Sequence, residues 1–341
     1  FEEPRLVARF GPAYSAYVQV TPLLPAAFTG ALAGLAKRAW LRARPTVERL
    51  ANHTVLFRAR ESVWVTYGAL VALGGVTGAV AAAPLLAGLG LAPGDIALYE
   101  LGLAASMLAG GRLVWLAYEW RRVWREPASM LRRVGFVSFG GYAGFLLFSL
   151  LFALEARLPV LGLFDRVVPP AFLISAWGRL GCLSYGCCYG RPCAHGLVWR
   201  DPHSKVHREQ GPAGCVPRVP TPLLSAALAA GVAALGGLLL TRGALPGAVA
   251  AGVLLAYAVA RFGLEHFRDE PRLARRLTKG QLLCLPVALG SLVLLLALPD
   301  AAFAGVHADF SVLPSLLPAF GAIGALAFLV CGFHRREVGR W

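Results

Sequence analysis

Eight apolar runs, each long enough to cross a bilayer, constrain this chain of 341 residues more than any other feature. A helix of about 20 apolar residues spans the hydrocarbon core of a membrane, and lipid admits only helices or closed barrels. The sequence therefore predicts an all-α polytopic membrane protein, a bundle of seven to eight transmembrane helices with a small polar head. The predicted spans are 64–91, 96–118, 134–155, 159–182, 222–241, 245–265, 280–298 and 313–333.

The composition limits the class of protein and the kinds of molecule that it is expected to bind. Hydrophobic residues make up 57% of the chain and charged residues only 15%, which excludes an ordinary soluble domain. The net charge of +15 is compatible with nucleic acid, but the basic residues lie between apolar runs and do not form a stripe with aromatic residues. We therefore expect no nucleic-acid partner, and contact with anionic lipid headgroups instead.

The chain divides into three parts. Residues 1–50 form an N-terminal extension whose moderately apolar segment, 12–36, fits either one extra span or an interfacial helix. Residues 51–299 form the main transmembrane domain, with the polar, proline-rich head at 184–221. Residues 300–341 add one C-terminal span and a basic tail.

Lysine and arginine are divided unevenly among the connections between spans. One alternating set of segments carries 25 of them, and the other set carries 2. The basic set is 37–60, 119–133, 191–218, 268–279 and 335–340. Because cytoplasmic loops are enriched in lysine and arginine, this division predicts a cytoplasmic head.

A glycine-rich signature with an arginine follows the fourth run. Residues 178–191 read Gly-Arg-Leu-Gly-Cys-Leu-Ser-Tyr-Gly-Cys-Cys-Tyr-Gly-Arg. Arg179 is costly at membrane depth unless it faces a cavity or a partner, so it is a candidate functional residue. The glycines Gly178 and Gly181 allow a bound anion to approach the backbone closely.

A second arginine lies on a later run. Tyr257, Arg261 and Glu265 recur every fourth residue and therefore share one helix face. Two membrane-depth arginines on separate helices predict a pocket for a phosphate-bearing lipid, because guanidinium groups bind phosphate with two parallel hydrogen bonds. Tyr257 and Glu265 either orient Arg261 or act directly.

Five of the seven cysteines gather in or beside the head. They are Cys182, Cys187, Cys188, Cys193 and Cys215. No Cys-x-x-Cys pair occurs, but His203 and His207 form a possible half of a metal site if that segment is helical. A disulfide between Cys193 and Cys215 is the alternative for an extracytoplasmic head.

Ordered motifs along some 240 residues resemble one family, the prolipoprotein diacylglyceryl transferases of bacterial inner membranes. The motifs are His53-Thr-Val-Leu-Phe, Val65-Thr-Tyr67-Gly, Phe139-Gly140-Gly141, Gly178-Arg179-Leu-Gly181, Tyr257-x-x-x-Arg261-Phe-x-x-Glu265 with Arg268, and Leu277-Thr-Lys-Gly280-Gln281-Leu-Leu. Residues 1–50 and 300–341 lie outside the resemblance.

The resemblance implies an enzyme that moves the diacylglyceryl group of phosphatidylglycerol to a lipobox cysteine thiol, with no cofactor or metal. It implies a multi-pass protein of the bacterial plasma membrane. It assigns catalytic roles to Arg179, Arg261 and Glu265. It assigns substrate binding to Tyr67, Gly140, Gly141, Gly178, Gly181, Cys182, Cys187 and Tyr257.

Three positions depart from the family pattern. Phe139 stands where the family often has a histidine, Cys182 where it has an asparagine, and Cys187 where it has a glutamate. Phenylalanine cannot accept a proton, which leaves Glu265, His266 and His195 as candidate bases.

These departures keep several alternatives open. The acceptor is either a lipobox-bearing preprotein or another nucleophile, and another anionic phospholipid can replace phosphatidylglycerol. The competing function is a membrane thiol-redox or metal-binding protein on the same bundle, without transferase activity. Family members present the lipobox site on the periplasmic side, whereas the charge division predicts a cytoplasmic head. The Gly140-Gly141 pair fits either a close helix contact or a pocket wall.

Overall fold

The computed structural model describes residues 31–127, 135–243, 245–271, 277–298, 306–336 and 338. The side chains of residues 31–37, 194, 195 and 213 lie outside this description. The expectation for residues 12–36 therefore falls largely outside the described part of the chain.

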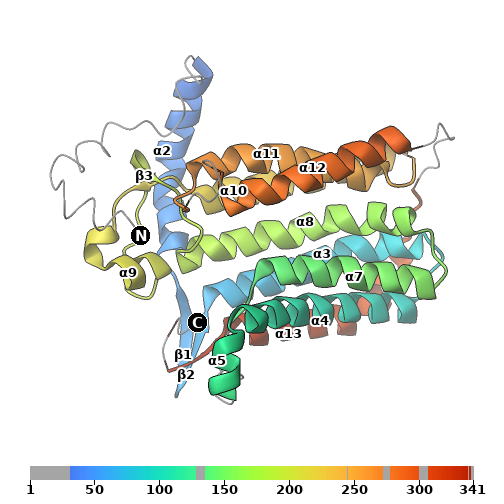
Figure 1. Cartoon of the computed structure of the whole chain (residues 1–341), viewed down its shortest axis with the longest axis horizontal. Coiled ribbons are helices and arrows are strands. Elements are labelled where there is room, and N and C mark those ends of the chain that lie inside the picture. Colours follow the sequence, from blue (N-terminus) through green and yellow to red (C-terminus); the bar gives the residue numbers. More distant parts are fainter. Residues whose placement is uncertain are drawn as a thin grey trace.

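Eight helices in the described part are long and apolar enough to cross a membrane, and they run side by side in one bundle (Figure 1). Each coincides with one predicted apolar run, which confirms the predicted all-α polytopic class. The helices are α3 (Thr66–Ala87), α4 (Pro93–Tyr118), α7 (Ser138–Glu155), α8 (Val160–Tyr185), α10 (Thr221–Arg242), α11 (Ala248–Leu264), α12 (Lys279–Ala297) and α13 (Leu313–Gly332). Short 3-10 turns extend two of them, η2 (Glu265–Phe267) after α11 and η4 (Phe310–Val312) before α13.

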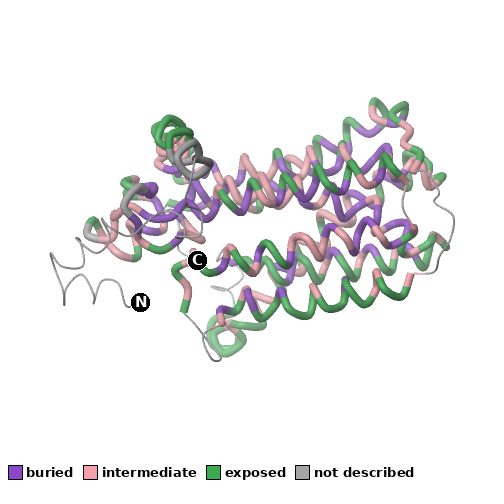
Figure 2. The backbone as a smooth tube through the Cα atoms, turned by 90° about the horizontal axis from the view of Figure 1, so that it is seen from above, coloured by how far each residue is buried: buried purple, intermediate pink, exposed green. Residues whose placement is uncertain are grey.

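Helix α8 lies at the centre of the bundle. It packs against α3, α10 and α11, while α4 packs on α7 and α12 packs on α11. Figure 2 shows buried residues where helices face one another and exposed residues along the outer sides. The exposed residues of α7 include Leu146, Leu147 and Leu151, which is expected for helices whose outer surface meets lipid.

Glycines set the closest helix contacts. A Cβ atom on Gly140 of α7 would lie 2.2 Å from the Gly110 carbonyl oxygen of α4. A Cβ atom on Gly68 of α3 would lie 2.2 Å from the Gly332 Cα atom of α13. Backbones approach this closely only where side chains are missing. Gly140 is therefore a helix-packing residue.

The described parts of the five basic segments lie at one end of the bundle. Because successive spans alternate in direction, the connections after α4, α8 and α11 return to the end at which α3 begins (Figure 1). The short helix α5 (Trp120–Arg125) belongs to this end and exposes Trp120 and Trp124, as aromatic residues at a membrane interface do. The uneven charge of the sequence is therefore a difference between the two ends of the molecule.

A three-stranded antiparallel sheet at the same end was not predicted. Strands β1 (Val55–Ala59) and β2 (Ser62–Val65) form a hairpin before α3, and β4 (Phe333–Arg335) pairs with β2 after α13. Trp64 of β2 stacks on Phe328 of α13 with 4.8 Å between ring centroids. The sheet thus ties the start of α3, the first of the eight spans, to the end of α13, the last.

The polar head folds against this end of the bundle. It contains β3 (Pro192–Leu197), α9 (Lys205–Gln210) and the 3-10 turn η1 (Pro212–Gly214). The helix α2 (Ala31–Ala51) packs on α8 and β3 and is not among the eight apolar helices. Asn52, directly after α2, joins this helix to the head, since its Nδ2 atom donates to the Val198 carbonyl oxygen at 2.9 Å.

Arg218 organises the interior of the head. Its side chain is fully buried, and Nη1 donates to the Asp269 carboxylate at 2.9 Å. Its Nη2 atom donates to Gln210 Oε1 at 2.7 Å, and the guanidinium group lies over the Tyr189 ring. Arg218 therefore connects the head to the segment that follows α11.

Candidate functional site

The predicted face of α11 carries a buried ion pair. Arg261 and Glu265 are 7% and 1% exposed, and the Arg261 Nη2 atom donates to Glu265 Oε1. Arg261 Nη1 also donates to Ser225 Oγ of α10 at 3.0 Å. Because a buried charge needs a partner, Glu265 and Ser225 explain how a guanidinium group is kept at this depth.

The start of α12 completes the surroundings of Glu265. Thr278 Oγ1 donates to Glu265 Oε2 at 3.2 Å, and Arg268 Nη1 donates to Oε1 at 3.3 Å. Thr278 also caps α12, in a reciprocal capping box with Gln281. A Cβ atom on Gly280 would lie 2.6 Å from the Glu265 carboxyl carbon. The Gly280-Gln281 motif of the sequence thus packs directly against the Glu265 carboxylate.

Glu265 accepts hydrogen bonds from two arginines and one threonine. Both of its oxygen atoms already accept hydrogen bonds, one from Thr278 and the other from Arg261 and Arg268. This arrangement favours the orienting role over direct action.

Arg179 of α8 lies within electrostatic range of Arg261 and Arg268. The Tyr257 hydroxyl of α11 interacts with Arg179, and the Tyr142 hydroxyl of α7 lies near both. Three guanidinium groups therefore converge where α8 and α11 meet, with two carboxylates: Glu265, shared by Arg261 and Arg268, and Glu270, which pairs with Arg268. This surplus of positive charge is suited to an anion.

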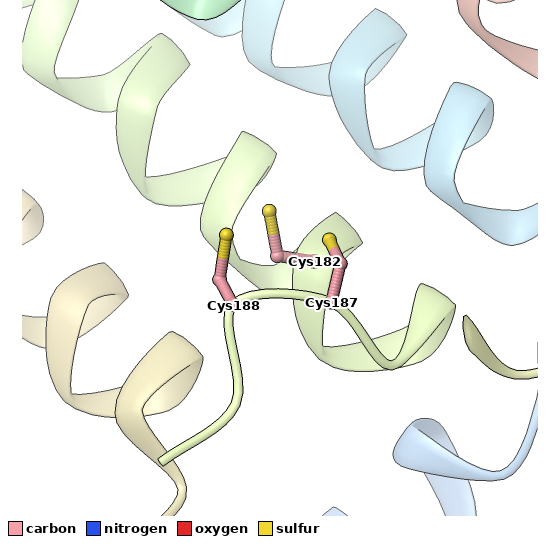
Figure 3. Close-up of side chains that lie close together, drawn as sticks. All are labelled: Cys182, Cys187 and Cys188. Atoms are coloured by element: carbon pink, nitrogen blue, oxygen red, sulfur yellow. The ribbon is translucent and has the colours of Figure 1, made fainter. Parts of the chain in front are cut away.

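Three thiols lie together on and after the last turn of α8 (Figure 3). The Sγ atoms of Cys182, Cys187 and Cys188 all lie within 4.8 Å of one another. Arg179 Nη1 donates to Cys188 Sγ at 3.8 Å. Two of the three family departures, Cys182 and Cys187, thus belong to one cluster.

The pKa values of two thiols in the cluster are shifted in opposite directions. Hydrogen bonds from the Cys182 and Cys187 thiols, with the charges of Arg268 and Arg179, lower the pKa of the Cys188 thiol well below its ordinary value. Hydrogen bonds with Cys182 and Cys188, with burial, raise the pKa of the Cys187 thiol. The cluster therefore favours a thiolate at Cys188.

Tyr67 packs directly on the signature. A Cβ atom on Gly181 would lie 2.7 Å from the Tyr67 ring, which also packs edge-on against Tyr185. Gly178 faces open space, since no atom lies within 4 Å of its Cβ position. The two signature glycines thus differ: Gly181 makes room for Tyr67, and Gly178 leaves the surface beside Arg179 open.

An apolar groove runs along the outer surface of α10 and α11. Its volume is about 530 Å³, and its walls include Leu224, Leu228, Ala260 and Leu264. Ser225, which accepts from Arg261, lies between the two leucines along α10. The groove is therefore adjacent to the arginine site and has the apolar character that an acyl chain requires.

Other predicted residues contact a neighbouring helix or lie at the surface of the bundle. Gly140 packs on Gly110 of α4, and Gly141 has ordinary contacts with Met107 and Phe136. Phe139 is 54% exposed on α7. The glycine pair thus belongs to the α4–α7 contact.

The remaining hypotheses concern a metal half-site, a disulfide and two candidate histidine bases. His203 precedes α9, which begins at Lys205, so the helical pair with His207 does not form. Cys193 and Cys215, both among the described residues, do not form the expected disulfide with each other. The side chain of His195 lies outside the described residues. His266 lies next to Gln281, with 3.2 Å between the His266 Nδ1 atom and the Gln281 Nε2 atom.

Ser225, Thr278, Arg268 and Tyr142 were missed as site residues. Arg268 follows the motif that ends at Glu265, and Thr278 lies inside the motif that begins at Leu277. Both could therefore have been proposed from the sequence. Ser225 and Tyr142 lie on other helices and became visible only through packing.

Fold and site together define a multi-pass membrane protein with a buried cationic site and an apolar groove on two of the same helices, α10 and α11. The family model for prolipoprotein diacylglyceryl transferase matches residues 54–297. The chain belongs to this family.

Curated relatives carry the same family name. The chain is 33% identical over 172 residues to phosphatidylglycerol–prolipoprotein diacylglyceryl transferase 2 of Clostridium perfringens, which covers 49% of the chain and 64% of that protein. It is 31% identical over 209 residues to phosphatidylglycerol–prolipoprotein diacylglyceryl transferase of Nitrobacter winogradskyi, which covers 58% of the chain and 69% of that protein. The match thus spans less than two thirds of the Clostridium perfringens relative.

Proposed function

We propose that the chain transfers the diacylglyceryl group of phosphatidylglycerol to a cysteine thiol of a prolipoprotein in the bacterial inner membrane. The observation that carries this proposal is the convergence of Arg179, Arg261 and Arg268 near the ends of α8 and α11. The family names of the relatives support the reaction class.

Arg179 and Arg261 bind the phosphate group of the donor lipid. Charge-assisted, bidentate hydrogen bonds from guanidinium groups fit phosphate oxygens. Arg261 reaches the site from α11 and Arg179 from α8, so a phosphate between them joins the two helices. Glu265 positions Arg261 and Arg268 and takes no part in the proton transfer.

The acyl chains lie in the adjacent groove of α10 and α11. Its lining includes Leu224, Leu228 and Leu264, which bury apolar surface at about 25 cal/mol per Å². Because the groove is open on the outer surface of the bundle, the lipid enters sideways from the bilayer.

The transfer step forms a carbon–sulfur bond. The acceptor thiol loses its proton to a base or to water, and the thiolate attacks the glycerol carbon that carries the phosphate. The carbon–oxygen bond to the phosphate breaks, and glycerol phosphate leaves with the electron pair. The arginines stabilise the negative charge that develops on this leaving group, an effect that is typically worth about 3–4 kcal/mol per donor.

The experiment uses the purified protein in vesicles of phosphatidylglycerol with a peptide that carries a lipobox cysteine. Mass spectrometry of the peptide measures the added diacylglyceryl group. We expect Arg179→Ala and Arg261→Ala to lower the transfer rate by about 100-fold or more. The matched control is Arg166→Ala on α8, because Arg166 donates to the Gly162 carbonyl oxygen at the far end of the helix.

Two results would overturn the proposal. One is the absence of lipid-modified peptide with the unmodified protein. The other is equal transfer by the Arg179→Ala and Arg166→Ala variants. Vesicles of a zwitterionic phospholipid show whether the anionic donor is required.

A further inference from the structure

The three-thiol cluster has a geometry that the transfer step does not explain. Cys182, Cys187 and Cys188 come from a helix end and a turn, yet their Sγ atoms lie within 4.8 Å of one another (Figure 3). A fourth described histidine, cysteine or carboxylate does not share this group. The cluster thus offers three soft ligands and one open position.

The backbone is bent to bring the thiols together. Helix α8 ends at Gly186, whose φ of 70° lies in the left-handed region that glycine tolerates. Cys188 has a φ of 57°, which is uncommon for a non-glycine residue. The Thr221 hydroxyl donates to the Cys188 carbonyl oxygen at 2.7 Å and holds this strained turn. A residue kept in such a conformation is a sign of function.

The spacing fits a metal ion bound by thiolates. Zinc lies about 2.3 Å from each sulfur in a tetrahedral site, which separates the sulfur atoms by about 3.8 Å. The three Sγ atoms therefore need to draw together by at most about 1 Å, which side-chain rotation supplies. Soft thiolate ligands favour zinc or another thiophilic ion over magnesium or calcium.

We propose that Cys182, Cys187 and Cys188 bind one zinc ion whose fourth position takes the acceptor thiol of the transfer reaction. This inference rests on the proposed function. Catalytic zinc sites have three protein ligands and one open position, whereas structural sites are closed by four.

The charges around the cluster balance such a site. Zinc with three thiolates carries a net charge of −1, and a fourth thiolate makes it −2. Arg179 donates to Cys188 at 3.8 Å, and Arg268 lies within electrostatic range of the same sulfur. The arginines that face the lipid phosphate thus also face the sulfur ligands, which places the acceptor thiol next to the donor.

The zinc ion removes the need for a histidine at position 139. A thiol that coordinates zinc loses its proton outright, and that proton passes to water. The bound sulfur attacks the glycerol carbon, the carbon–oxygen bond breaks, and glycerol phosphate leaves with the electron pair. The thioether product is a weaker ligand than a thiolate and dissociates from the ion.

The first test measures metal content. The full-length protein, purified under reducing conditions and loaded with zinc, is dialysed and analysed for zinc and copper. We expect about one zinc ion per chain and a loss of about tenfold or more in each of Cys182→Ser, Cys187→Ser and Cys188→Ser. The matched control is Cys215→Ser in the head, which keeps the full zinc content because Cys215 lies beside His207 and outside the cluster.

A second measurement does not depend on the folding of any variant. X-ray absorption of the zinc-loaded, unmodified protein gives the ligands directly, and we expect three sulfur neighbours at about 2.3 Å. Addition of a cysteine-containing lipobox peptide raises this number to four, and the same peptide with serine does not. A shell of nitrogen and oxygen, zinc below about one tenth per chain, or an intact mass that shows a disulfide within the cluster overturns the proposal.

The outcome separates this inference from the proposed function. If zinc does not bind but Arg179-dependent lipid transfer persists, the zinc site is wrong and the transferase stands. If zinc binds through the three thiols and no lipid is transferred, the transferase proposal fails, and so does the acceptor role given to the metal.

Discussion

A buried carboxylate, Glu265, positions two of the three arginines of the site. It is 1% exposed and accepts hydrogen bonds from Arg261, Arg268 and Thr278. The removal of one partner from a buried, hydrogen-bonded charge network costs about 3–5 kcal/mol. Much of the geometry of this cationic site therefore depends on the space left for one side chain.

Gly280 provides that space, which leads to a prediction for Gly280→Ala. The added Cβ atom would lie 2.6 Å from the Glu265 carboxyl carbon, so the carboxylate must move and the arginines with it. We expect lipid transfer to fall by about tenfold or more, measured in phosphatidylglycerol vesicles. Gly290→Ala on the same helix is the control, because open space surrounds its Cβ position. Equal activity of the two variants would show that the carboxylate position does not matter.

The residue pattern predicted part of this site and missed part of it. Tyr257, Arg261 and Glu265 were expected on one face because their spacing is helical, and the Arg261–Glu265 pair follows from that spacing. The convergence of Cys182 with Cys188 was not foreseen. It depends on the left-handed turn at Gly186 and Cys188, and local sequence rules describe such a turn poorly for a cysteine.

Among the helices and strands, hydropathy predicted the eight membrane-spanning helices but not the three-stranded sheet. An apolar run of about 20 residues has one folded outcome in lipid, and all eight predicted runs are helices. Strands of three to five residues leave no comparable pattern. The pairing of β4 with β2 also joins segments that are far apart in the sequence, one before the first of the eight spans and one after the last.

His334 of β4 makes the attachment of this strand sensitive to acid. Burial, with the charge of Arg208, lowers the His334 pKa from 6.5 to about 4. Because the unfolded chain binds more protons between these values, the stabilisation is complete above pH 6.5 and is lost as pH falls toward 4. The loss reaches at most about 3 kcal/mol.

The measurement is the thermal stability of the protein in detergent as a function of pH. We expect the unmodified protein to lose stability between pH 6.5 and pH 4 more steeply than His334→Gln, which cannot titrate. His203→Gln is the matched control, because His203 contacts Arg58 in an exposed environment. Parallel profiles for the unmodified protein and His334→Gln would remove His334 as the source of the acid sensitivity.

At the scale of the whole molecule, the eight spans place the head, the sheet and the described parts of the five basic segments at one end. The connection after α3 lies at the opposite end. An impermeant maleimide should therefore label Glu209→Cys in the head and Ala92→Cys before α4 from opposite faces of the membrane. Labelling of both from the same face would contradict the fold.

The face that labels Glu209→Cys also decides the acceptor. The charge division predicts the cytoplasmic face, and the family resemblance implies the periplasmic face for the lipobox site. A periplasmic head supports a secreted prolipoprotein as acceptor, and a cytoplasmic head requires a different nucleophile.

In the proposed function, Arg179 of α8 and Arg261 of α11 bind one lipid phosphate together. The most direct measurement is a double-mutant cycle, with phosphatidylglycerol retained by the protein quantified by native mass spectrometry. We expect Arg179→Ala, Arg261→Ala and the double variant to lose similar amounts of bound lipid, with a coupling of about 1 kcal/mol or more between the sites. Losses that simply add, or retention unchanged from the Arg166→Ala control, would contradict a shared phosphate.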